Sequence, residues 1–354
     1  MDDFMGITSI PELYHQCHAN AYASTRLKGD STVNHALDSK LERESNWSHK
    51  GSTVVKSNTL FGTLNISASE TIKKTKTLIK DNIHKEYQSN YLHHIKSLAM
   101  QGEYTRLWEI LDVDFSWKAD IFGLPRGVAK FLLNSILTTL PTKDNLTKWG
   151  KVLSPACNLC GEYETTAHVL SGCKTMLEQG RYTWRHDSIL NLIHSFIPNT
   201  NLTNITIHTD LGDQSWTIPP DLLPTSDRPD LVVIDYCKKS ISILELTVPF
   251  ERNISKDHQY KCHKYAHLMI DLQGLGYSVK YFAIEIGCRA SISEDNNKRL
   301  HAFYKSIPRF KFSNRDFKNL KKSICKTVIT ASFVLFKSKH FKSWTVPKSY
   351  CNVK

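Results

Sequence analysis

The sequence has no long hydrophobic run. None of its stretches approaches the roughly 18 uncharged apolar residues that a membrane-spanning helix needs, so we expect no membrane partner. Residues Met1 to Phe4 form neither a basic nor an apolar segment, so we expect no secretory signal peptide. No internal repeat of roughly 20 to 50 residues is present, which argues against a solenoid or a propeller.

Acidic residues are almost missing from the C-terminal part of the chain. Residues 298–354 hold fifteen Lys and Arg but a single acid, Asp316, whereas the net charge of the whole chain is +12. Such a concentration of positive charge indicates a polyanionic partner, most simply nucleic acid. The pattern predicts a mostly helical basic tail whose Lys321 and Lys322 contact nucleic acid. The alternative is a solvated charged face.

A disulfide framework is also absent from the pattern. The cysteine count is nine, an odd number, and six cysteines are scattered singly along the chain. These six are Cys17, Cys237, Cys262, Cys288, Cys325 and Cys351. Scattered thiols of this kind are typical of proteins from a reducing compartment.

The composition is that of a globular protein, and the first half of the chain has helical patterns. The length of 354 residues is enough for two or three compact units, and 40% of the residues are hydrophobic. Pro11 predicts the start of a helix, and a second helix is expected over 36–47. Residues 48–65 are predicted to be a linker or exposed loop, and a long Lys-rich helix is expected over 67–100.

The second half of the chain changes to strand-like patterns. Two β-rich runs, 231–235 and 241–248, are separated by a short polar turn and predict a hairpin. A helix over 254–272 and a strand over 277–286 follow. Together with a helix predicted at 181–197, this order indicates an α/β domain.

One short segment has the spacing of a zinc site, Cys157-x2-Cys160-x7-His168-x4-Cys173. A Cys-x-x-Cys turn supplies two thiolates, and a His and a Cys about one turn apart supply the other two ligands of a tetrahedron. Gly161 stands where a knuckle turn needs a permissive residue. Four protein ligands leave no open position, so the predicted zinc is structural. The alternative is a chance cluster of buried thiols.

The predicted hairpin carries two acids that it should bring together. Asp230 precedes the first strand, and Glu245 lies on the returning strand. Converging oxygen ligands suit Mg²⁺, which polarises a phosphate and lowers the pKa of an attacking water. The alternative is that Asp230 caps a turn and Glu245 pairs with an arginine.

A lysine on the following helix fits the same site. Lys261 shares a helical face with Tyr265 and Leu268, and a lysine on an inward face needs a partner. The acidic pair would provide that partner, and the ammonium group would stabilise negative charge on a phosphate. Lys264, one turn away, is the second candidate. The alternative for Lys261 is a buried stem with its head in solvent.

Taken together, these motifs resemble the C-terminal part of polyproteins from site-specific non-LTR retrotransposons, which carry a restriction-like endonuclease of the PD-(D/E)xK class. The resemblance covers about residues 155–290 and includes the cysteine–histidine cluster, Arg185-His186-Asp187, Arg228-Pro229-Asp230 and the segment 245–251. It implies a mixed central sheet flanked by helices, with Asp230 and Glu245 as the acids that hold a catalytic Mg²⁺.

The resemblance also implies roles for further residues. Thr247 occupies the usual lysine position of the Glu-x-Lys motif, and in this family the lysine migrates to the next helix, which fits Lys261 or Lys264. Asp187 would be a further acidic ligand; its alternative role is favourable charge near a helix N-terminus. The residues implied to contact nucleic acid are Arg185, His186 and Arg228.

The reverse transcriptase palm of that family, with its Phe/Tyr-x-Asp-Asp motif, is missing from the sequence. The resemblance therefore implies a truncated or separately encoded C-terminal piece that does not synthesise DNA. It implies structural Zn²⁺ and catalytic Mg²⁺, a nuclear location, and as partners target DNA, element RNA and a reverse transcriptase supplied in trans. The alternative function, of another class, is a non-catalytic nucleic-acid-binding remnant.

On these grounds the chain divides into five predicted segments. They are a helical region with a loop, similar to the part that follows a reverse transcriptase thumb (1–65), a helical linker domain (66–150), the zinc knuckle (151–180), the restriction-like endonuclease domain (181–295) and the basic helical tail (296–354).

Overall fold

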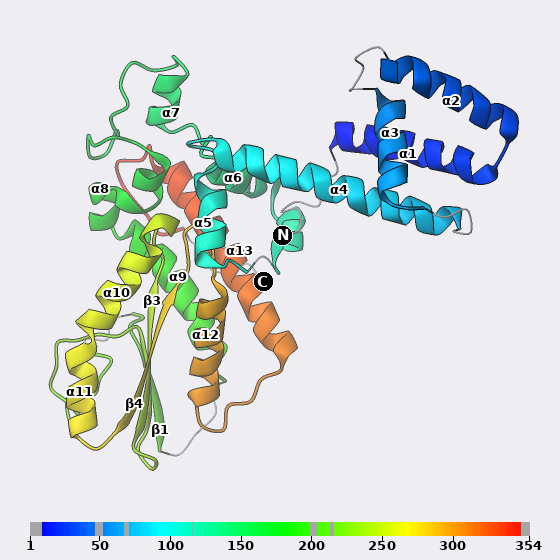
Figure 1. Cartoon of the computed structure of the whole chain (residues 1–354). Coiled ribbons are helices and arrows are strands. Elements are labelled where there is room, and N and C mark those ends of the chain that lie inside the picture. Colours follow the sequence, from blue (N-terminus) through cyan, green and yellow to red (C-terminus); the bar gives the residue numbers. More distant parts are fainter. Residues whose placement is uncertain are drawn as a thin grey trace. The chain divides into compact units, whose positions relative to one another are not determined.

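The computed structural model describes residues 9–46, 52–66, 71–114, 116–198, 204–212 and 216–347. The chain forms two compact units, residues 1–97 and residues 98–354, and each is described by itself (Figure 1). Within the described residues, no helix combines the length and the apolar character that crossing a membrane requires.

The N-terminal unit is a cluster of helices. Its elements are α1 (Ile10–Lys28), α2 (Ser31–Asn46), α3 (Thr53–Thr63) and α4 (Ile72–Ser97). Pro11 lies in the first turn of α1, as the sequence predicts, and the Ser9 side chain caps the helix. The unit packs around Ala19 and Ala23 of α1 and Ile79 and Ile83 of α4.

Two sequence predictions differ from this unit. Residues 48–65 were expected to be a linker or loop, but α3 lies there, because Ser52 caps a helix whose Leu60 and Phe61 pack against the core of the unit. The unit also ends at residue 97, inside the predicted segment 66–150, because α4 packs on α1 rather than serving as a linker. The predicted end of the second helix, Trp47, lies outside the described residues.

The C-terminal unit contains all the strands of the described residues. Its elements are α5 (Glu103–Leu111), η1 (Lys118–Gly123), α6 (Arg126–Ile136), α7 (Lys143–Lys148), η2 (His168–Gly172), α8 (Lys174–Glu178), α9 (Arg181–Ser195), β1 (Ile205–Thr209), β2 (Leu231–Asp235), β3 (Ser240–Thr247), η3 (Glu251–Asn253), α10 (Ile254–Lys264), α11 (Ala266–Gly274), β4 (Ser278–Glu285), α12 (Glu294–Ser306) and α13 (Asn314–Ser338).

The four strands form one mixed sheet in the order β1-β2-β3-β4. The β1–β2 and β2–β3 pairs are antiparallel, which confirms the predicted hairpin, and β3 pairs with β4 in parallel. A parallel pair needs a crossover connection, which α10 and α11 supply. These two helices cover one face of the sheet and α9 and α12 the other, so the fold is a mixed α+β arrangement (Figure 1).

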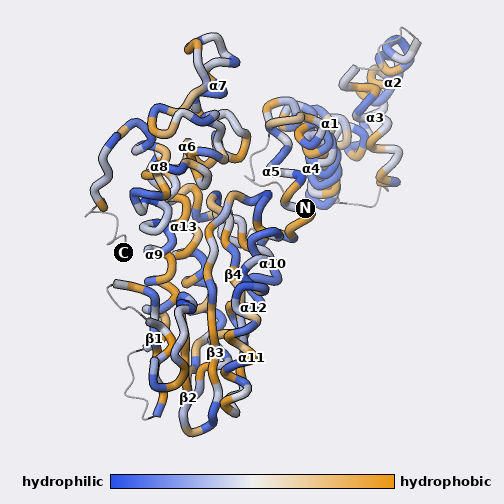
Figure 2. The backbone as a smooth tube through the Cα atoms, turned by 90° about the vertical axis from the view of Figure 1, so that its left-hand side faces the viewer, coloured by the Kyte–Doolittle hydropathy of each residue, from blue (hydrophilic) through white to orange (hydrophobic). Residues whose placement is uncertain are grey.

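One hydrophobic core of this unit lies between the sheet and the crossover helices. Figure 2 shows apolar residues concentrated along β2 and β3. The cluster comprises Ile218, Val232, Ile234, Ile241, Ile243, Tyr265, Leu268 and Leu272. The single helix predicted over 254–272 is broken at Tyr265, which is fully buried and donates a hydrogen bond to the carbonyl of Arg228 at 3.0 Å.

The predicted basic tail is part of the folded core. Along α13 one face is buried, including Phe317, Leu320, Ile324 and Val328, and the helix packs against α9 and α6. The predicted tail is helical over Asn314–Ser338, but it is a core helix, because its apolar residues form one buried face and the lysines within it lie at exposed or half-buried positions of an amphipathic helix. Among the cysteines, eight are free thiols, and Cys351 lies outside the described residues.

Deletion of residues 298–354 is expected to unfold the C-terminal unit rather than only to weaken nucleic-acid binding. The deletion removes all of α13, whose buried apolar side chains each stabilise the fold by about 1.5–3 kcal/mol. Circular dichroism and thermal melting will measure the loss. As a control, Lys318→Gln on the exposed face of α13 should melt like the parent. A truncated chain with a cooperative transition near the parental temperature would contradict this prediction.

Candidate zinc centre and acidic site

The zinc knuckle begins with a tight turn at Cys157. The carbonyl of Cys157 accepts a hydrogen bond from the Gly161 amide at 3.0 Å, and the Leu159 amide lies 3.4 Å from the Cys157 sulfur. Gly161 has φ = +79°, a left-handed backbone conformation that residues with a Cβ atom rarely adopt. The turn therefore explains the glycine after the second cysteine.

The structure brings the four predicted ligands together. His168 lies in a short π-helical turn, η2, and Cys173 follows it directly. The ligand atoms of Cys157, Cys160, His168 and Cys173 all lie within 4.8 Å of one another. The Cys160 sulfur is 3.3 Å from His168 Nε2 and 3.6 Å from the Cys173 sulfur, close to the separation of roughly 3.5–3.8 Å that tetrahedral zinc requires. The Cys3His set fits a structural Zn²⁺.

The surroundings of the knuckle favour metal ligation. Burial lowers the pKa of His168, which keeps its imidazole in the neutral form that binds metal. Burial, together with the neighbouring thiols, raises the pKa of the Cys173 thiol to about 12. A coordinated zinc ion reverses that effect because it deprotonates its thiol ligands.

Further contacts fasten the knuckle to α9 and to the end of α13. The Tyr182 hydroxyl donates to the carbonyls of His168 and Val169, at 3.1 and 3.0 Å. Lys339, which is 3% exposed, forms a 2.6 Å ion pair with the fully buried Glu164 of the knuckle. A buried charge needs such a partner, so the knuckle and the C-terminal segment are expected to fold together.

The hairpin brings Asp230 and Glu245 together at one end of the sheet. The Asp230 amide donates to Glu245 Oε2 at 3.2 Å, and the Leu246 amide donates to Asp230 Oδ2 at 2.6 Å. Both acids are buried, with 7% and 1% exposure. Neither serves only as a surface turn cap or as the partner of an arginine, which were the alternative interpretations.

The two candidate lysines on α10 have different environments. The Lys261 ammonium contacts Glu245 Oε1, and its side chain is only 23% exposed. Lys264 is exposed and donates to the Tyr265 hydroxyl at 2.9 Å. Lys261 therefore faces the acidic site, as its helical position predicts. The alternative, in which its ammonium group lies in solvent, does not match the structure.

A histidine from α9 completes this site. His186 Nε2 lies 3.2 Å from Asp230 Oδ2 and 3.2 Å from the carbonyl oxygen of Leu246, while Nδ1 lies 3.0 Å from Asp187 Oδ1. Burial on its own lowers the pKa of His186, but Asp230 and Asp187 outweigh it and raise that pKa to about 10. His186, which the sequence predicts to contact DNA, lies against Asp230 in this site.

Arg185 does not match its predicted role. Its guanidinium is buried and donates to the carbonyls of Leu170 and Val248 and to the Ser332 hydroxyl, at 2.9, 2.9 and 3.1 Å. A group so enclosed has no access to a DNA phosphate, so the prediction of nucleic-acid contact is wrong for Arg185. It ties α9 to the knuckle, the sheet and α13.

The other predicted nucleic-acid contacts are engaged within the protein. Arg228 pairs with Asp210. Lys321 forms a 2.7 Å ion pair with Asp114, and Lys322 lies 3.1 Å from Asp120. Asp187, the further acid implied by the resemblance, accepts from His186. For Lys321, which is 18% exposed, the acid partner and the burial oppose a phosphate contact.

A second charged cluster lies beside the acidic pair and was not predicted from the sequence. Glu285 of β4 is paired in register with Thr247 and is 1% exposed. His258 Nδ1 lies 2.8 Å from Glu285 Oε1, and Arg299 lies 3.4 Å from Glu285 Oε2. His258 and Lys261 are one helical turn apart on α10, each against a strand carboxylate. That spacing is the only signal the sequence offered.

The protonation of Glu245 predicts a pH dependence of stability. Burial and the nearby Asp230 raise the pKa of Glu245 to about 7, against the opposing effect of Lys261. In the unfolded chain the ordinary value is about 4.3. At pH values between these two pKa values, Glu245 is protonated in the folded protein but not in the unfolded chain. The contribution of Glu245 to stability therefore declines as the pH rises from about 4.3 to about 7.

Glu245→Gln is expected to remove this decline. The free energy of unfolding of the variant minus that of the parent should increase by on the order of a few kcal/mol between pH 5 and pH 8 without magnesium. Thermal melting at several pH values measures the difference. Substitution of the exposed Glu178 by Gln is the control and should give a constant offset. A pH-independent difference for Glu245→Gln would show that the carboxyl titrates normally.

The comparison with known protein families concerns the knuckle and its surroundings. Residues 101–179 match the family model described as zinc-binding in reverse transcriptase. This segment runs from the start of α5 to the end of α8 and includes all four candidate zinc ligands. No match was found among curated proteins. The chain thus contains a segment similar to the zinc-binding domain of reverse-transcriptase-related proteins, which supports an origin in a retroelement.

Proposed function

We propose that this protein is a retroelement-derived, Mg²⁺-dependent DNA endonuclease of the PD-(D/E)xK class, related to the C-terminal part of site-specific non-LTR retrotransposon polyproteins. The proposal rests on one observation above all. Two buried carboxylates, Asp230 and Glu245, meet at one end of a mixed sheet, and the Lys261 ammonium lies against Glu245. Two acids and a lysine are the groups that metal-dependent phosphodiester hydrolysis needs.

The donor set of this site suits magnesium. Asp230 Oδ2 and the Leu246 carbonyl oxygen are each 3.2 Å from the same atom, His186 Nε2, so the two oxygens lie near each other at this end of the sheet. Hard oxygen ligands of this kind are the ones that Mg²⁺ prefers. Asp230, Glu245 and the Leu246 carbonyl would hold the metal, which when bound polarises a phosphate and acidifies a water.

The remaining groups act through charge and position. Lys261 keeps Glu245 oriented, and the neighbouring carboxylate and hydrogen bond hold the pKa of the lysine above its usual value despite burial. It therefore stays protonated and can stabilise negative charge on a phosphate. Thr247 stands where the usual motif has its lysine, and the proposal gives that role to Lys261 from the next helix. His186 positions Asp230.

Nicking of supercoiled plasmid DNA by the zinc-loaded full chain tests the proposal. Relaxed circles are expected with Mg²⁺ and none with EDTA. Lys261→Gln should lower the rate by about 10²–10³-fold, the usual value of a charge contact made in the transition state. Lys264→Gln is the matched control on the same helix and should stay near the parental rate. Equal losses would mean that another group supplies the charge.

A non-catalytic function is the second candidate, because the matched zinc-binding segment favours nucleic-acid binding by itself. Affinity for DNA or RNA without cleavage under any divalent cation would favour this candidate and count against the nuclease. Under either function, the proposed setting is the nucleus, with target DNA, element RNA and a reverse transcriptase supplied in trans as partners.

A further inference from the structure

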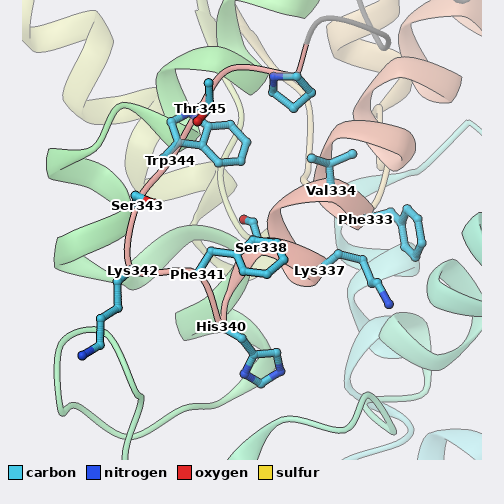
Figure 3. A pocket seen from close by; sticks show the side chains of 11 residues that line it. Phe333, Val334, Lys337, Ser338, His340, Phe341, Lys342, Ser343, Trp344 and Thr345 are labelled. Atoms are coloured by element: carbon cyan, nitrogen blue, oxygen red, sulfur yellow. The ribbon is translucent and has the colours of Figure 1, made fainter.

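The end of α13 and the chain that follows it line an open hollow with basic and aromatic side chains. The chain turns back after Ser338, and the hollow of about 710 Å³ lies beside residues 333–347. Figure 3 shows Phe341 and Trp344 on the returning segment and Lys337 on the helix at its border. A volume of this size is in the range of small-ligand sites.

The two aromatic side chains of the returning segment, Trp344 and Phe341, differ in how far they are packed. Trp344 packs edge-on against Trp184, with ring centroids 5.6 Å apart, and the Arg181 guanidinium lies 5.3 Å from its ring. Phe341, in contrast, is 62% exposed. Leaving an aromatic ring in water forgoes the stabilisation of burial, so an exposed ring that lines a hollow suggests a ligand with an apolar face.

The charge around the hollow has one sign. No acidic residue follows Asp316 in the sequence. Lys337 and Lys342 line the hollow and are exposed, and within the described ranges neither forms an ion pair. Lys339 differs, because its ammonium is buried against Glu164. The two free cations beside the exposed Phe341 ring and the partly buried Trp344 ring are complementary to an anionic ligand that also has flat rings.

The backbone of the returning segment is held in place by the knuckle side of the unit. The Arg181 guanidinium donates to the carbonyls of Ser338 and Phe341, each at 2.6 Å, and Gln179 Nε2 donates to the Lys342 carbonyl at 2.7 Å. Arg181 itself is fully buried. The wall of the hollow is therefore organised before any ligand binds, which lowers the entropy cost of binding.

We propose that this hollow binds an unstacked base of a single-stranded nucleic acid, with Phe341 and Trp344 as the stacking surface and Lys337 and Lys342 on the flanking phosphates. Stacking on aromatic side chains beside a basic surface is the general way in which proteins bind single strands. A duplex does not fit this chemistry, because its bases are stacked on one another. The inference is independent of the nuclease proposal and uses none of its residues.

Fluorescence anisotropy of the zinc-loaded full chain tests the site in magnesium-free buffer. The probes are labelled 12-nucleotide oligo(dT) and oligo(U), with a blunt duplex of equal length as comparison. Phe341→Ala should weaken binding of the single strands by about 5- to 150-fold, the usual value of one stacked base. Lys337→Gln with Lys342→Gln should reduce the slope of log K against log salt by about 1.4. Duplex binding should stay unchanged.

Two matched controls separate this site from general effects. Phe122→Ala removes another exposed ring, at 67% exposure, and Lys318→Gln removes a charge elsewhere on α13; both should bind like the parent. Melting temperatures establish that the variants are folded. Preference for oligo(dT) or oligo(U) identifies the natural strand, and either order supports the site if Phe341→Ala weakens it. Single-strand affinity within twofold of the parent for Phe341→Ala, or equal weakening of duplex binding, would overturn the proposal.

Discussion

Cys173→Ser is expected to release zinc and to unfold the knuckle together with the end of α13. The Cys173 thiol is 1% exposed and belongs to a hydrophobic cluster with Met176, Trp184, Ala331 and Leu335. The binding energy of a closed zinc site is folding energy, and its loss is among the few single changes that cost more than about 4–5 kcal/mol. Because the cluster joins the knuckle to α13, the damage should spread beyond the ligand segment.

Metal analysis, near-ultraviolet circular dichroism and hydrogen exchange over residues 155–179 measure this effect. The parent should hold one zinc per chain, and the variant should lose it along with the signal of the packed Trp184 and Trp344 rings. Cys237→Ser, at an exposed thiol outside the cluster, is the matched control and should leave all three readouts unchanged. A carefully purified parent without zinc would refute the assignment.

Asp230→Asn and Glu245→Gln are each expected to lower plasmid nicking by at least about 10³-fold while DNA affinity stays nearly constant. The reason is that these acids would hold the metal, whereas affinity for DNA rests on Lys and Arg contacts with phosphate. Loss of a carboxylate also lowers the repulsion of a phosphate, so binding should if anything tighten slightly. The comparison requires single-turnover nicking rates and binding measured on the same DNA.

Asp271→Asn, at an exposed acid on α11, is the control for removal of one negative charge and should nick like the parent. Thermal melting without magnesium shows whether the acid variants remain folded, since their pairs with His186 and Lys261 are lost. If both acid variants cleave at the parental rate, the Asp230/Glu245 site is not the catalytic one, and any nuclease activity lies elsewhere.

Local features of this protein could be predicted because the residues that make them are close along the chain. The four zinc ligands lie between Cys157 and Cys173, so a short turn and one helical turn are enough to bring them together. Asp230, directly before β2, and Glu245, on β3, lie at the open end of one hairpin, and the register of that hairpin follows from its short turn. Lys261 could be assigned to the inward face because helical period alone sets which residues share a face.

The sequence by itself therefore determined the zinc knuckle, the hairpin with its acids and the lysine that faces them. Only the tertiary structure decided what comes from far along the chain: His186 against Asp230, Glu285 beside the pair, and α13 as a core helix rather than a basic tail. Arg185 illustrates the physical reason. From sequence alone, an arginine is expected to be a surface cation. The packing of α9, the sheet and α13 around Arg185 encloses its guanidinium and gives it carbonyl partners.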